Sequence, residues 1–128
     1  MTETENGIRV CSEVYPTEVV SLNVFINCGS RQETKETSGS AHFLEHLHFK
    51  GTHNRSRLQL ELDVENMGGS LNAYTSRENT SYSLNCFPNK VDSAMDILSD
   101  MLLNSKYTKE SLENERDTIF RELVETQK

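Results

Sequence analysis

Residues 79–104 read NTSYSLNCFPNKVDSAMDILSDMLLN, and the period of the apolar residues changes within this stretch. Before Pro88 the side chains suited to burial occupy every second position, which predicts a strand with one buried face. They are Thr80, Tyr82, Leu84 and Cys86. After Pro88 they recur at steps of three and four, which predicts an amphipathic helix over residues 90–104. They are Val91, Ala94, Met95, Leu98, Met101 and Leu102.

Further strands are predicted upstream of this stretch. SLNAYTS (70–76) is expected to form a hairpin with the strand at 79–87, with Arg77 and Glu78 at its tip. EVVSLNVFINC (18–28) alternates in the same way, and IRVCSEV (8–14) is rich in β-formers. The residues expected on the buried face of the segment at 18–28 are Val20, Leu22, Val24, Ile26 and Cys28.

Three more helices complete the predicted order of elements. AHFLEHLHF (41–49) is expected to be helical after a cap at Ser38 or Ser40, and the last helix to begin near Thr108 and reach the C-terminus. SRLQLELDVENMGG (56–69) has Ser56 as its N-cap, and its expected core face carries Leu58, Leu62 and Met67. The order ββααββαα predicts an α+β fold with a mostly antiparallel sheet packed with helices.

Composition narrows the classes of function. The chain has 128 residues, with 13 basic and 20 acidic side chains, and a net charge of −7. This balance argues against nucleic acid as the main partner, and no apolar run is long enough for a membrane span. The three cysteines form no CxxC pair, which favours a reducing compartment. The N-terminus resembles neither a secretory signal nor an Arg-rich transit peptide.

The chemistry lies in His42-Phe43-Leu44-Glu45-His46. Residues four apart share one face of a helix, so both imidazoles can converge on a metal ion such as Zn²⁺. Glu45 lies beside the pair, where its carboxylate can act as a general base in metal-assisted hydrolysis without occupying the metal.

The spacing leaves the third ligand open. His48 points away from the pair and His53 lies in a loop, so an acid from the last helix is the better candidate. Glu115 and Glu122 are two turns apart on one face, and spacing prefers neither. The alternative is that the histidines bind no metal and the acids belong to a solvated face, together with Glu110, Glu113 and Glu125.

The sequence resembles the M16 inverzincin metallopeptidases, the insulinase/pitrilysin clan, and most resembles the β subunits of the mitochondrial processing peptidases. The matching stretches are GSRQE (29–33), SGSAHFLEHLHFKGT (38–52), LELDVENMGGSLNAYTSRENTSY (60–82) and ENERDTIFRELVE (113–125). Two departures, Leu47 and His48, are interpreted as variation in packing, with an auxiliary metal contact from His48 as the alternative.

The resemblance implies a zinc site made by His42, His46 and Glu122, with Glu45 and the supporting Glu115 as catalytic residues. It also implies an edge strand that pairs with an extended peptide, in which Asn72, Ala73 and Tyr74 contact the substrate. Residues 1–128 would then form the N-terminal part of an M16 catalytic domain. As a fragment, this part is expected to be a poor enzyme alone.

The activity implied is a zinc metalloendopeptidase that removes basic presequences in the mitochondrial matrix or a derived organelle. Its implied partner is the α subunit of a processing peptidase heterodimer. The alternative is a core structural subunit of the respiratory bc1 complex, which shares the fold. A broad oligopeptidase of the insulysin type is a further alternative, but LNAYTSRE (71–78) looks closer to the processing peptidases.

Overall fold

A three-stranded sheet is the base on which the helices pack. The structure is a computed structural model that describes residues 1–126, so the predicted helix end at Gln127 and Lys128 lies outside the described residues. The strands are β3 (Val20–Ile26), β4 (Ser70–Thr75) and β5 (Thr80–Cys86), in the order β3-β5-β4. Both pairings are antiparallel, with Leu84 of β5 opposite Leu22 on one side and Leu71 on the other. The predicted hairpin and the α+β class are therefore confirmed.

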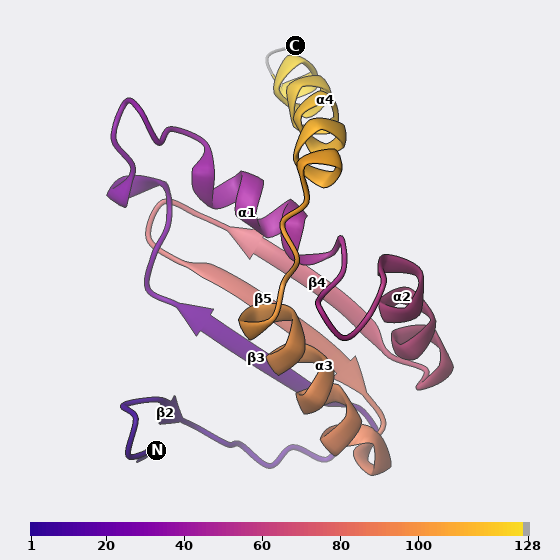
Figure 1. Cartoon of the computed structure of the whole chain (residues 1–128). Coiled ribbons are helices and arrows are strands. Elements are labelled where there is room, and N and C mark those ends of the chain that lie inside the picture. The colour runs from indigo at the N-terminus through magenta and orange to yellow at the C-terminus, as the bar shows by residue number, and fades with distance from the viewer. Residues whose placement is uncertain (127–128) are drawn as a thin grey trace.

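Three helices, α1 (Ser40–His48), α2 (Arg57–Asn66) and α3 (Val91–Leu103), pack on one face of this sheet (Figure 1). A further helix, α4 (Lys109–Thr126), packs against α1, and short 3-10 turns span Ser30–Gln32 and Pro88–Lys90. The buried face of β5 meets the apolar face of α3, as the change of period predicts. The core residues are Leu60, Val64, Met67, Tyr82, Leu84, Cys86, Ala94, Ile97, Leu98 and Met101. Within the described chain no helix is long and apolar enough to cross a bilayer.

The core face of α2 differs from the prediction. Leu58 and Leu62 are 63% and 39% exposed, whereas Leu60 and Val64 are buried beside Met67. Both pairs are four residues apart, so both form a stripe along the helix, and only the direction in which α2 packs decides between them.

Two other predictions about the edges of the fold are wrong. Only Arg9–Val10 (β2) of residues 8–14 is a strand, paired with β1 (Thr2–Glu3), because this segment has no core to pack against and remains exposed. In β3 the inward face ends at Val24, and Ile26 is 41% exposed. Cys28, beyond the end of the strand, is also exposed.

The helix caps are partly as predicted. Ser56 Oγ accepts from the Gln59 amide, and Thr108 Oγ1 accepts from the Ser111 amide. Neither Ser38 nor Ser40 caps α1, whose N-cap is Gly39 in the left-handed region, with φ of 88°. The Glu33 carboxylate instead accepts from the amides of Gly39 and Ala41, so an acid from the preceding loop supplies the cap.

Candidate metal centre

The candidate centre lies where α1 packs against α4 (Figure 1). The C-terminal turn of α1 is fixed by Leu47 and His48, which are both buried. This seating turns the opposite side of α1, with His42 and His46, toward the acids of α4.

Three possible ligand atoms converge between the two helices. The Nε2 atoms of His42 and His46 are 3.1 Å apart, and Glu122 Oε2 lies 3.5 Å from the first and 3.4 Å from the second. In tetrahedral coordination with bonds of about 2.0–2.1 Å, ligand atoms lie about 3.3–3.4 Å from one another. The separations in this cluster therefore fit one small metal ion with two imidazoles and one carboxylate.

Glu115, the other acid on this face of α4, contacts the far side of the His46 ring. Its Oε2 lies 3.0 Å from His46 Nδ1, and its Oε1 lies 2.6 Å from Lys50 Nζ. Burial alone would raise the pKa of Glu115, but the hydrogen bonds from Lys50 and His46 outweigh burial and leave it below the usual value. An ionised carboxylate only accepts, so Nδ1 carries the proton and Nε2 keeps its lone pair for a metal.

Glu45 extends from α1 toward the sheet. One of its carboxylate oxygens accepts a hydrogen bond from the Thr75 hydroxyl at the end of β4. This contact holds the carboxylate at the junction of the helix that carries the histidines and an edge strand of the described sheet.

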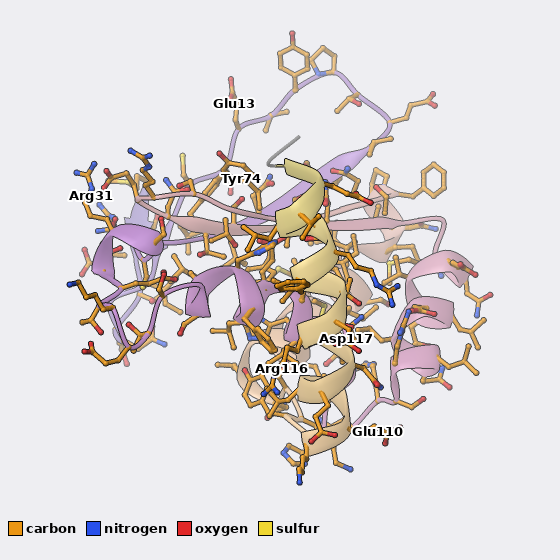
Figure 2. The ribbon with its side chains drawn as sticks, turned by 90° about the horizontal axis from the view of Figure 1, so that it is seen from above. Glu13, Arg31, Tyr74, Glu110, Arg116 and Asp117 are labelled. Atoms are coloured by element: carbon orange, nitrogen blue, oxygen red, sulfur yellow. The ribbon has the colours of Figure 1, made fainter. Side chains whose placement is uncertain are left out.

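The structure places the three predicted substrate residues in two environments. Ala73 packs against the core, whereas Asn72 and Tyr74 are exposed and, by the pleat of the strand, face away from α1. Figure 2 shows Tyr74 close to the strands. The Ala73 amide donates to Asn72 Oδ1. In β4, the backbone edge and Thr75 therefore lie toward Glu45, whereas the side chains of Asn72 and Tyr74 point away from it.

The other two histidines lie outside the cluster. His48 is buried, with Nδ1 2.6 Å from the Tyr82 hydroxyl and Nε2 3.2 Å from the Tyr107 hydroxyl, and burial lowers its pKa. Both ring nitrogens thus contact tyrosines, which supports the packing interpretation over an auxiliary metal contact. His53 is exposed in the loop after α1.

A groove of about 1010 Å³ opens beside His42 and Glu122, between the start of α1 and the second half of α4. Its apolar wall is made by Phe43, Ile119, Phe120 and Leu123. Among the described residues, none closes the candidate centre on this side, so a ligand could reach it through the groove.

The family model described as Insulinase (Peptidase family M16) matches residues 9–128. The chain belongs to the M16 peptidase family. The mitochondrial-processing peptidase subunit beta of Caenorhabditis elegans is 50% identical over 125 residues, 98% of this chain and 27% of that protein. The subunit of the same name from Neurospora crassa is 50% identical over 128 residues, 99% of this chain and 27% of that protein.

Two further relatives widen the comparison of this M16 chain. The mitochondrial core protein I of the ubiquinol-cytochrome-c reductase complex of Euglena gracilis is 51% identical over 117 residues, 91% of this chain and 24% of that protein. A protease from Helicobacter pylori has a similar structure, with a TM-score of 0.77 and 30% identity over 83% of this chain and 26% of that one. The chain spans about a quarter of the length of the relatives it matches.

Two residues at the candidate centre, Lys50 and Thr75, were not predicted from the sequence. Both stand inside stretches that match the family, Lys50 in FKGT (49–52) and Thr75 in LNAYTS (71–76). Lys50 is four residues after His46 but lies beyond the end of α1, and Thr75 has no regular spacing from the histidines. The packing of α1 against α4 and β4 therefore brings both to the site.

Proposed function

We propose that this chain carries the metal site of a zinc endopeptidase that removes N-terminal presequences from precursors imported into the mitochondrial matrix. The observation that carries the proposal is the meeting of His42, His46 and Glu122 with separations of 3.1–3.5 Å, next to Glu45. Residues 1–128 are proposed to be the N-terminal part of the M16 catalytic domain.

In this proposal His42, His46 and Glu122 hold zinc, and Glu115 orients His46 through its Nδ1 proton. The donor set suits zinc, which takes imidazole nitrogen and carboxylate oxygen readily. When bound, zinc makes a water molecule easier to deprotonate and polarises the scissile carbonyl.

Glu45 moves the proton. The Thr75 hydroxyl holds one of its oxygens, which leaves the other to accept a proton from the attacking water. The same carboxylate then gives the proton to the amine that leaves when the peptide bond breaks. Because β4 is an edge strand of the described sheet, its backbone is placed to pair with an extended peptide along Asn72, Ala73 and Tyr74.

The names of the relatives support the substrate class and the partner. Proteins from a nematode and a fungus with 50% identity are named mitochondrial-processing peptidase subunit beta, which supports an α subunit as the partner and presequences as substrates. The net charge of −7 agrees with basic presequences.

The second candidate is a core subunit of a respiratory complex. The Euglena relative, named as such a core protein, is 51% identical, so identity alone does not separate the two functions. Copurification separates them: an α subunit without cytochromes supports the peptidase, and membrane-bound cytochromes support the core subunit.

The test of the peptidase is Glu45→Gln in the full-length protein, assayed by cleavage of a presequence peptide with a processing-peptidase α subunit present. Loss of the general base should lower turnover by about 10²–10⁴-fold. Zinc content, measured by elemental analysis, should stay the same because Glu45 is not a ligand.

Glu113→Gln is the matched control, since Glu113 is an exposed acid of α4 and should leave both readouts unchanged. Full activity in Glu45→Gln would contradict the assigned role. Cleavage by neither the wild type nor the variant, together with cytochrome copurification, would favour the core-subunit alternative.

A further inference from the structure

Lys50 follows α1 by two residues and sits behind the metal cluster. We propose that Lys50 is a positioning residue of the metal centre, which acts through Glu115 to hold the ring of His46 in its metal-binding orientation. The inference rests on the metal site of the proposed function and extends it to a residue that contacts none of the ligand atoms described above.

The geometry is a chain of three side chains. Lys50 Nζ lies 2.6 Å from Glu115 Oε1, and Glu115 Oε2 lies 3.0 Å from His46 Nδ1. Each carboxylate oxygen therefore has its own partner, and rotation of the carboxylate would break both contacts. With Oε2 fixed, Nδ1 of His46 keeps its partner and Nε2 stays directed at His42 and Glu122.

Burial explains why a cation is needed at this place. The side chains of Lys50 and Glu115 are only 18% and 7% exposed. A buried carboxylate whose only partner is a neutral imidazole is poorly compensated, so it would turn toward water or draw the ring out of position. Lys50 supplies the compensating charge from the side opposite His46, and leaves the imidazole free to serve the metal.

A second Lys–Glu pair, between Lys109 and Glu113 of α4, is exposed. Lys109 Nζ lies 3.8 Å from Glu113 Oε1, and the two side chains are 89% and 60% exposed. This pair contacts no histidine in the described structure and is solvated, so it is a matched control for the removal of a Lys–Glu pair.

The experiment is a double-mutant cycle on the zinc dissociation constant of the 128-residue chain, with Lys50→Met, Glu115→Gln and the double variant. Loss of an outer partner of a ligating histidine lowers metal affinity by about 10–100-fold, so Glu115→Gln should fall in this range and Lys50→Met should lose about tenfold. If Lys50 acts through Glu115, adding Lys50→Met to Glu115→Gln should change affinity by less than about twofold.

Two further readouts separate positioning from folding. The absorption spectrum of bound Co²⁺ should change in Lys50→Met, and it should be unchanged in Lys109→Met, which should also keep wild-type zinc affinity. If Lys50→Met alone does not fold, the zinc affinity of the double variant can still be compared with that of Glu115→Gln. In both of these proteins residue 115 is a neutral amide, so removal of Lys50 leaves no buried carboxylate without its cation.

Wild-type zinc affinity in Lys50→Met, or a full tenfold loss added on top of Glu115→Gln, would overturn the inference while leaving the metal site intact. Absence of zinc binding in the wild type would overturn the metal site and the inference with it.

Discussion

Two clusters of ionisable side chains in this chain differ in whether they contain a permanent cation. In the first, the guanidinium of Arg55 lies 3.0 Å from Asp63 and 2.7 Å from Asp100, and it also pairs with Asp96. In the second, at the metal centre, the groups that meet are two imidazole nitrogens and one carboxylate oxygen, none of which is a permanent cation.

The first cluster contains its own cation, although the one guanidinium of Arg55 offsets only part of the charge of three carboxylates. Burial alone would raise the pKa of Asp100, but donors from Thr52, Asn54, Asn104 and Arg55 outweigh burial and hold the pKa far below its usual value. These contacts join the loop after α1 to α2 and α3. The first cluster thus includes a cation of the chain and joins elements of the fold, whereas the ligand set proposed for zinc contains no permanent cation.

The largest expected effect comes from breaking the first cluster. Arg55→Met leaves Asp100 buried without its cation, and removal of one partner of a buried pair costs about 3–5 kcal/mol. The free energy of unfolding, measured by urea denaturation of the metal-free protein, should fall by this amount.

Arg31→Met is the control, because the Arg31–Glu78 pair is exposed and should contribute less than about 1 kcal/mol. Equal effects of the two substitutions would show that the Arg55 cluster has no special role in the fold.

A smaller effect is expected from acid. The folded-state pKa of Asp100 is depressed, so its stabilisation is present above the unfolded pKa of about 3.9 and is lost as pH falls toward the folded value. Asp100→Asn should be less stable than the wild type at pH 7. Between pH 5 and pH 2, its free energy of unfolding should fall by less than that of the wild type, and the difference should be on the order of 2 kcal/mol.

Urea denaturation across this pH range measures the difference, with Glu78→Gln as the exposed control. Parallel pH profiles for the wild type and Asp100→Asn would contradict the assignment of the acid sensitivity to this cluster.

The sequence predicts the elements whose buried faces are unambiguous. In β5 both the period and the buried face are as predicted. In α3 the helical period is correct and Ala94, Leu98 and Met101 are buried, but Met95 is 49% exposed and the buried Ile97 was not predicted. In α2 two stripes compete, Leu58 with Leu62 and Leu60 with Val64, and the wrong one is chosen because the direction of packing is not a local property.

At the candidate metal centre, too, the sequence predicts what one helix determines and not what depends on the packing of two helices. Spacing brings His42 and His46 together, because a single helix determines their separation. It cannot choose between Glu115 and Glu122, since both lie on the same face of α4 and only the placement of α1 decides which one meets Nε2. The resemblance to the M16 family implies Glu122, and Glu122 Oε2 lies 3.5 Å and 3.4 Å from the Nε2 atoms of His42 and His46.

The proposed zinc site is tested by isothermal titration of zinc into the metal-free chain, in the wild type and in His42→Ala. We expect one zinc ion per wild-type chain and an affinity at least about a hundredfold lower in His42→Ala, because a ligand is lost rather than an outer partner. Urea stability of the metal-free variant should stay within about 1 kcal/mol of the wild type, since the His42 side chain is 43% exposed. Equal zinc affinity in the two proteins, or no zinc bound by the wild type, would show that His42, His46 and Glu122 do not form a metal site.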